Sequence, residues 1–232
     1  MTPSPTDPDV LSELTLFQGV PAQELEKFAP LLNRKIFPAG ATVITADQLG
    51  DAVYVISAGS VKVHVIRPDG EEVILAVLGP GEVVGEMSLA DSLGRSADVS
   101  TLEESVLLWM HRSAFRMKLE EVPMLSPRNL ASLLSRRVRL TNAHLLSLAA
   151  LDVPGRVASQ LLALAREYGE STPQGTRVPM RLTQSDLAGL AGASRVRVNQ
   201  ALGYFRKRGL ISMDREGHFT VRDEDALARR TR

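Results

Sequence analysis

The segment RLTQSDLAGLAGASRVRVNQALGYFRKRGLI, residues 181–211, decides the architecture of the C-terminal part of the chain. Thr183 is placed to cap a short helix, and Gly192 is placed to end it, because glycine tolerates a left-handed backbone. Ser194 is placed to cap a second helix. The apolar residues expected to face inward on the two helices are Leu187, Leu190, Val198, Leu202 and Phe205. Two short helices joined by a glycine turn predict a helix-turn-helix.

The second of these helices has the polar side chains that base recognition requires. In the major groove arginine pairs with guanine, and asparagine and glutamine pair with adenine. The expected exposed residues are Arg195, Arg197, Asn199 and Gln200, and the following Arg206, Lys207 and Arg208 suit phosphate contacts. The stretch GLISMDREGHFTV, residues 209–221, predicts a two-stranded wing. Any one arginine is as well explained as solvated surface charge, whereas the coincident cap, glycine turn and polar first turn favour DNA binding.

The charge of the chain is divided unevenly. Residues 1–153 contain 13 Lys and Arg against 19 Asp and Glu, a formal charge of −6, whereas residues 154–232 contain 14 against 8, a formal charge of +6. A basic C-terminal part indicates a polyanionic partner. Taken alone, the imbalance is equally well explained by chance.

Upstream, from Ile36 to Trp109, the sequence changes to short β-branched runs separated by glycines and turn residues. The runs are TVIT, AVYVI, VKVHVI, EVILAVL, EVVGE and SVLLW. Pro68-Asp69-Gly70 predicts a hairpin turn, since proline presets φ and glycine accepts a positive φ. Short strands at this spacing predict an antiparallel sandwich or roll. Apolar spacing also predicts helices within residues 10–33, with Pro21 at the start of the second.

Residues 127–149 predict one helix about 34 Å long, with Ser126-Pro127 at its start. Apolar or small residues recur along it at spacings of three and four: Leu130, Leu134, Val138, Thr141, Leu145 and Leu148. This stripe favours a dimer seam, and a helix packed on its own domain is the alternative. Pro154-Gly155 within ALDVPGR, residues 150–156, predicts a hinge, followed by a helix over roughly 155–168.

Composition excludes several other classes of protein. The chain has no cysteine, which excludes disulfides and iron–sulfur clusters and fits a cytoplasmic location. No apolar run is long enough to span a membrane, and residues 1–9 are a polar, proline-rich stretch that we expect to be a disordered tail. The four histidines show no clustered ligand spacing, so no metal or haem is expected, and His64 is expected at the surface. We predict no enzymatic activity.

The stretch GEMSLADSLGRSA, residues 85–97, places Glu86 and Arg95 nine positions apart among small residues. Taken alone, this arrangement favours a salt bridge inside a turn over a ligand site. The context changes that interpretation. The order of roll, long helix, hinge and helix-turn-helix, with GEMSL…GRSA, RRVRLTNAHLLSLAALDVPGR and LTQSDLAGLAGASRVRVNQAL, resembles the cyclic-AMP receptor protein branch of the bacterial catabolite-activator and fumarate-nitrate regulator family. The resemblance covers about residues 10–225.

The resemblance implies an α+β fold: an N-terminal antiparallel β-roll (a cupin-like jelly roll that binds cyclic nucleotides), a long dimerisation helix and a C-terminal winged helix-turn-helix. The implied organisation is a tail at 1–9, an effector domain at 10–126, a dimerisation helix at 127–149, a hinge at 150–155 and a DNA-binding domain at 156–232. The implied function is a homodimeric transcription regulator controlled by cyclic AMP. RNA polymerase is an implied partner, through a loop at residues 169–176.

The same resemblance implies the residues of the cyclic AMP site: Gly85, Glu86, Met87, Ser88, Arg95, Ser96, Ala97, Arg137, Thr141 and Asn142. Glu86 would accept a hydrogen bond from the ribose 2′-hydroxyl, and Arg95 would pair with the cyclic phosphate, as a guanidinium fork suits a phosphodiester. Ser96 would add a donor. Thr141 and Asn142 would meet adenine, with Asn142 in place of the serine usual in the family.

The DNA-reading residues match the family at Thr183, Ser194 and Arg195 and depart from it at three positions. Val196 replaces a glutamate, Gln200 replaces a base-reading arginine, and Gln184 replaces a phosphate-binding arginine. Valine meets a thymine methyl or another apolar edge, and glutamine favours adenine. We therefore predict a pseudo-palindromic operator in double-stranded DNA that differs from the usual half-site of the family.

Three alternatives remain open from the sequence. A regulator of the same architecture that needs no effector, or another one, would have a pocket that is empty or self-filled. An enzyme on a cupin-like roll would need a metal cluster or a catalytic pair, and the roll-forming stretch offers only His64. A cyclic-nucleotide module of a kinase or channel would not account for the predicted helix-turn-helix.

Overall fold

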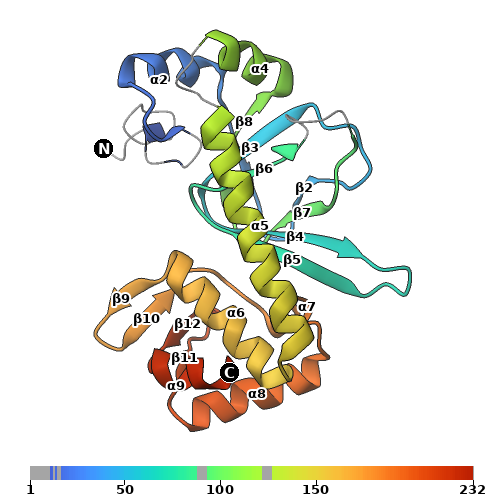
Figure 1. The fold of residues 1–232 in the computed structure, drawn as a ribbon, viewed down its shortest axis with the longest axis vertical. Coiled ribbons are helices and arrows are strands. Elements are labelled where there is room, and N and C mark those ends of the chain that lie inside the picture. Colours follow the sequence, from blue (N-terminus) through green and yellow to red (C-terminus); the bar gives the residue numbers. More distant parts are fainter. Residues whose placement is uncertain (1–10, 13, 15–16, 88–92, 122–126, 232) are drawn as a thin grey trace. The chain divides into compact units, whose positions relative to one another are not determined.

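The structure is a computed structural model that describes residues 11–231, except 13, 15–16, 88–92 and 122–126 (Figure 1). Its internal contacts divide the chain into two compact units. The first comprises Met1–Val65 and Val77–Val138, and the second comprises Ile66–Ala76 and Arg139–Arg232. Within the described residues, no helix combines the length and the apolar character needed to cross a bilayer.

The N-terminal part is a two-sheet roll with short helices before and after it. Its elements are α2 (Ala22–Phe28), η2 (Ala29–Leu31), β1 (Asn33–Phe37), β2 (Thr42–Ile44), β3 (Ala52–Ala58), β4 (Val61–Ile66), β5 (Glu72–Leu78), β6 (Val83–Val84), β7 (Asp98–Thr101), β8 (Ser105–His111) and α4 (Arg112–Glu121). The strands form two four-stranded sheets with the orders β1-β8-β3-β6 and β2-β7-β4-β5. The pairings β1–β8, β3–β8 and β4–β7 are antiparallel, which confirms the predicted roll.

All six predicted apolar runs form strands, and the predicted hairpin turn has Gly70 at φ +82°. Three elements of this N-terminal part were not predicted. β1 has the sequence NRKIF, and only Phe37 of it is buried, so it shows no alternation of apolar and polar residues. β7 is short and partly polar, and it is ordered by pairing with β2 and β4. α4 follows β8 directly, in a stretch to which no element was assigned from the sequence.

A buried cluster forms the core between the first sheet and the N-terminal helical segments. Phe17 and Phe28 contact each other at 5.5 Å between ring centroids, and Phe115 of α4 and Leu133 of the long helix join the same cluster. His64 corrects an expectation: it is buried, and its Nε2 lies 2.9 Å from Oγ of Ser100. The cause is the cross-strand neighbour, because pairing of β4 with β7 gives the ring a polar partner away from solvent.

The long helix α5 (Pro127–Ala150) is followed by α6 (Val153–Tyr168). Pro154 and Gly155 lie in the first turn of α6, so the chain breaks two residues earlier than the proline suggested. A proline is tolerated there because the first N–H groups of a helix have no internal partner. Asp152 is the N-cap, and its carboxylate accepts a hydrogen bond of 2.8 Å from the amide of Gly155.

The C-terminal part is a winged helix-turn-helix, as predicted. Its further elements are β9 (Glu170–Thr172), β10 (Gly175–Val178), α7 (Gln184–Ala191), α8 (Arg195–Lys207), β11 (Ile211–Met213), β12 (Phe219–Val221), α9 (Glu224–Ala228) and η3 (Arg229–Thr231). The four strands form one sheet in the order β11-β12-β10-β9. The inward-facing residues predicted on α7 and α8 are all buried, as are Val157 and Leu161 on α6.

Candidate functional site

Residues 85–97 form the candidate nucleotide cassette, and two buried carboxylates mark its start. Glu86 is 3% exposed and accepts a hydrogen bond from Nη1 of Arg137 on α5. Glu82 is also buried, with Oε1 lying 2.6 Å from Nη2 of Arg136 and Oε2 lying 3.4 Å from Nη2 of Arg137. Arg137 also donates to the carbonyl of Val83 at 2.9 Å. Two arginines of α5 therefore satisfy two carboxylates of the roll.

Arg95 lies at the other end of the cassette and donates to backbone carbonyls. Its Nη1 lies 3.0 Å from the carbonyl oxygen of Gly85, and its Nη2 donates to the carbonyl of Ala52. A Cβ atom added to Gly50 would lie 2.6 Å from Cζ of Arg95, and one added to Gly85 would lie 2.4 Å from Nη1. The guanidinium therefore occupies space that both glycines leave open.

Burial is the main influence on the ionisation of this group. It lowers the pKa of Arg95, and nearby Tyr54, Asp51 and Glu86 oppose that effect. Burial likewise raises the pKa of Tyr54, with Arg95 as the opposing charge. A guanidinium remains protonated under such a shift, so Arg95 is a half-buried cation suited to an anionic ligand.

The remaining predicted ligand residues lie at several places. Ser96 is exposed and donates to Sδ of Met87 at 3.4 Å, and Ala97 is buried. Ser88 lies outside the described residues. Thr141 and Asn142 belong to the second unit, where both are exposed on α5. The structure thus brings Gly85, Glu86, Arg95 and Arg137 together in the first unit.

The sequence analysis missed three residues of this cluster: Gly50, Glu82 and Arg136. A signal for Glu82 was present, since the stretch GEVVGE at 81–86 repeats a Gly-Glu pair at an even spacing. The left-handed Gly85 interrupts the extended backbone after β6, so the tertiary structure and not the spacing alone brings the two carboxylates to α5. A second signal was the adjacent pair Arg136 and Arg137, whose two positive charges complement the two carboxylates with which they form ion pairs.

The predicted caps position the DNA-reading helix. Thr183 and Asp186 form a capping box at the start of α7, with the amide of Thr183 donating to the buried Asp186 carboxylate at 2.9 Å. Gly192 ends α7 at φ +55°, and Oγ of Ser194 accepts from the amide of Arg197 at the start of α8. These local bonds set the angle at which α8 leaves the turn.

The side chains predicted to read DNA lie mostly in solvent. Val196 is 66% exposed, so its side chain is accessible to a partner at the start of α8. Asn199 and Gln184 are partly exposed. The other members of the set are exposed: Thr183, Ser194, Arg195, Arg197, Gln200, Arg206 and Lys207.

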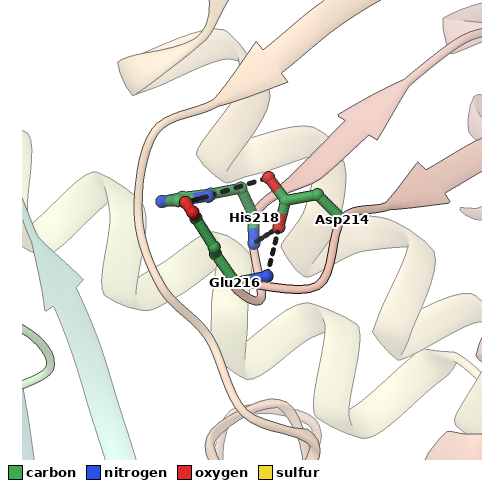
Figure 2. Close-up of side chains that lie close together, drawn as sticks. All are labelled: Asp214, Glu216 and His218. Atoms are coloured by element: carbon green, nitrogen blue, oxygen red, sulfur yellow. Dashed lines mark hydrogen bonds and ion pairs between the residues drawn. The ribbon is translucent and has the colours of Figure 1, made fainter.

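The turn between β11 and β12 has a cluster that the sequence analysis overlooked (Figure 2). Asp214, Glu216 and His218 bring one potential metal-ligand atom each within 4.8 Å of one another. Asp214 Oδ1 accepts from the amides of Glu216 and His218, and Oδ2 lies 2.9 Å from Nδ1 of His218. Desolvation raises the pKa of Asp214, but the hydrogen bonds and charge of His218, together with the amide of Glu216, lower the pKa overall. These hydrogen bonds stabilise the turn between β11 and β12, which accounts for the closeness of the three side chains.

Two family models match the parts of the chain in which the candidate sites lie. A cyclic nucleotide-binding domain matches residues 34–121, and a Crp-like helix-turn-helix domain matches residues 155–230. The CRP-like cAMP-activated global transcriptional regulator of Mycobacterium tuberculosis is 38% identical over 224 residues, 97% of this chain and 99% of that protein. The cyclic AMP receptor protein of Thermus thermophilus is 33% identical over 198 residues, 85% and 88% of the two chains.

Among solved structures, the c-di-GMP responsive global regulator CLP of Xanthomonas campestris superposes with a TM-score of 0.71 at 27% identity. The match covers 87% of this chain and 99% of that one. Both domains, their order and the length of the match agree with the motifs at residues 85–97 and 181–211. The chain belongs to the CRP family of DNA-binding transcription regulators with a cyclic nucleotide-binding domain.

Proposed function

We propose that this chain is a homodimeric transcription regulator whose affinity for its operator is controlled by cyclic AMP. The observation that carries this proposal is the presence, within one cassette, of a buried carboxylate, Glu86, and a half-buried guanidinium, Arg95. A cyclic phosphodiester is an anion that a guanidinium binds through parallel hydrogen bonds. A carboxylate only accepts hydrogen bonds, so Glu86 selects a hydroxyl such as the ribose 2′-OH. Thr141 and Asn142 are proposed to contact adenine.

The proposed allosteric step is an exchange of hydrogen bonds. The donors of Arg95 are engaged by the carbonyls of Gly85 and Ala52, and Glu86 is engaged by Arg137 of α5. A nucleotide that forms hydrogen bonds with Arg95 and Glu86 displaces Arg137 from Glu86. Because Arg137 belongs to α5, this change alters the contacts between α5 and the cassette. The ligand shifts the equilibrium only by its difference in affinity for the two states, typically about 1–3 kcal/mol.

The proposed dimer forms along the helix predicted at 127–149, through its residues from Val138 onward. Val138, Thr141 and Leu145 lie on one face of the helix at heptad spacing, and Leu145 is 62% exposed. The hinge at 150–155 then leads to the DNA-binding domain at 156–232. Two recognition helices separated by about 34 Å, one duplex turn, meet the halves of a pseudo-palindrome.

In each half-site, we propose that Arg195 reads guanine, Gln200 reads adenine and Val196 lies against a thymine methyl. Arg206 and Lys207 are proposed to contact phosphates. The hairpin of β9 and β10, which contains the loop at 169–176, is the proposed contact for RNA polymerase by analogy with the family.

A second candidate, a regulator of the same architecture with another effector or none, has support of its own. Both charged groups of the cassette already have partners inside the protein, as a self-filled pocket would. The related regulator of Xanthomonas campestris is described as responsive to c-di-GMP.

Titration calorimetry and operator binding, with cyclic AMP, cyclic GMP or no nucleotide, separate these candidates. Cyclic AMP control predicts heat of binding, thermal stabilisation and tighter operator binding with cyclic AMP. Arg95→Ala abolishes all three, whereas Arg34→Ala, at an exposed arginine on β1, changes none. Operator binding that is equally tight without nucleotide supports the second candidate and rejects the first.

A further inference from the structure

Two arginines from distant parts of the sequence lie over one aromatic ring on α8. Cζ of Arg208, the C-cap of α8, lies 5.3 Å from the ring centroid of Tyr204. Cζ of Arg230, from η3 near the end of the chain, lies 5.2 Å from the same centroid. Both distances fall within the range of a cation–π contact. Tyr204 is itself held edge-on against the buried Phe205, with 5.8 Å between ring centroids.

The segment that contains Arg230 is fixed to the domain by several contacts. Asp223 caps α9 through a 2.8 Å bond from the amide of Ala226, and Glu224 pairs with Arg166 of α6 at 2.9 Å. η3 packs against α6, where a Cβ added to Gly155 would come within 2.8 Å of the carbonyl oxygen of Arg230. Arg230 is therefore presented by ordered backbone at a defined place beside α8.

The two guanidinium groups keep their hydrogen-bonding capacity. Both side chains are exposed, and among residues 11–231, gaps excepted, no carboxylate lies within ion-pair distance of either. Stacking over a ring uses the face of a guanidinium, and its N–H donors point outward in the plane. Both cations lie within 5.3 Å of the centroid of one ring, and an anion that contacts both is attracted by each.

This basic cluster, formed by Tyr204, Arg208 and Arg230, continues the proposed DNA-binding face. Tyr204 lies one helical turn after Gln200, and the proposed phosphate-binding Arg206 and Lys207 precede Arg208 directly. The C-terminal end of α8 lies about 20 Å along the helix axis from Arg195, beyond the width of a major groove. At that distance the available partner on a duplex is the sugar–phosphate backbone.

We propose that Arg208 and Arg230, held on Tyr204, bind a phosphate of the DNA strand that borders the groove read by α8. The inference rests on the proposed DNA binding and extends it to the C-terminal segment. Such a contact adds affinity for any duplex and does not discriminate between sequences.

The test is the salt dependence of binding to an operator and to an unrelated duplex. Each phosphate contact contributes about 0.9 to the slope of log K against log salt concentration, so Arg230→Ala lowers the slope of a dimer by about 2. The affinity falls by the same factor for both duplexes. Tyr204→Leu has the same effect, whereas Tyr204→Phe and Arg230→Lys retain most of the wild-type slope. Arg34→Ala, at an exposed arginine on β1 that has no part in holding this segment, is the charge-matched control and leaves the slope unchanged.

Three results overturn the inference. A wild-type slope and affinity for Arg230→Ala, in an assay where Arg195→Ala loses sequence preference, rejects the phosphate contact and leaves the proposed function standing. A loss confined to the operator shows base reading instead. Absence of DNA binding by the wild-type protein, with and without nucleotide, rejects both. Thermal unfolding of each variant identifies any loss caused by misfolding, and Arg230→Gln then replaces Arg230→Ala.

Discussion

At the scale of single residues, the candidate nucleotide site depends on two glycines as much as on its charged side chains. Gly50 and Gly85 leave the space that the Arg95 guanidinium occupies. The two glycines differ in backbone conformation, since Gly85 has φ +83°, whereas Gly50 is not among the positive-φ residues. A substitution at Gly50 therefore changes the space around Arg95 without straining the backbone.

Gly50→Ala is expected to weaken cyclic nucleotide binding about tenfold, or about 1.4 kcal/mol. The new Cβ would lie 2.6 Å from Cζ and Nε of Arg95 and displace the guanidinium. Because the displaced group is the end of a flexible side chain, the free energy of unfolding changes by less than about 0.5 kcal/mol. Calorimetry and urea denaturation measure the two quantities. Gly203→Ala, on α8, is the control, because no atom lies within 4 Å of its added Cβ. If Gly50→Ala binds nucleotide as tightly as the wild type, the Arg95 guanidinium does not need the space beside Gly50.

At the scale of elements, the junction of α5 and α6 is held by side-chain hydrogen bonds from charged and neutral polar residues. Arg156 of α6 donates to the carbonyl of Leu151 at 3.0 Å, and Asp152 caps the helix. Nε2 of Gln160 lies 3.0 Å from Nδ1 of the half-buried His144, so the histidine accepts this bond as a neutral ring. Protonation would remove the acceptor and place a charge in a partly desolvated position.

The stability of the second unit is expected to fall as the pH drops below about 6.5. Burial lowers the pKa of His144 in the folded state, so the unfolded state binds more protons over this range, and the stabilisation is complete above the unfolded pKa. Urea midpoints at pH 7.5 and 5.5 test this. His144→Gln should show a smaller drop than the wild type, whereas His111→Gln, at an exposed histidine on β8, should match it. An equal drop in both variants contradicts the assignment.

At the scale of the whole molecule, α5 is the element that both proposed activities share. In its N-terminal half, Leu133 packs into the core of the roll. Arg136 and Arg137 form ion pairs with Glu82 and Glu86, so this side of the helix already has partners within the first unit. Leu130 and Leu134, which the sequence analysis assigned to the dimer seam, are instead packed against that core. Val138 and Leu145 remain exposed, so the proposed seam begins further along the helix.

Leu145→Glu is expected to convert a dimer into a monomer, because it places two carboxylates in an apolar seam. Light scattering after gel filtration measures the mass, and operator affinity should fall with it, since one recognition helix loses its partner. Leu49→Glu adds the same charge at a residue of the roll that is 85% exposed, and should leave the mass unchanged. A monomeric wild type, or a dimeric Leu145→Glu, refutes the seam.

The fold was predictable from the sequence wherever the deciding interactions are local. The caps at Thr183 and Ser194, the left-handed Gly192 and the turn at Gly70 act within a few residues, so they can be identified in a single sequence. β1 and β7 were missed because their order comes from strands far along the chain.

The sequence by itself determined six strands of the roll, the helix-turn-helix and the presence of opposite charges at Glu86 and Arg95. Only the tertiary structure decided the partners of those charges. Glu86 pairs with Arg137, 51 positions away, and Arg95 donates to carbonyls at positions 52 and 85. The physical reason is that side-chain charges act through space, so sheet pairing and the packing of α5 determine which of them meet.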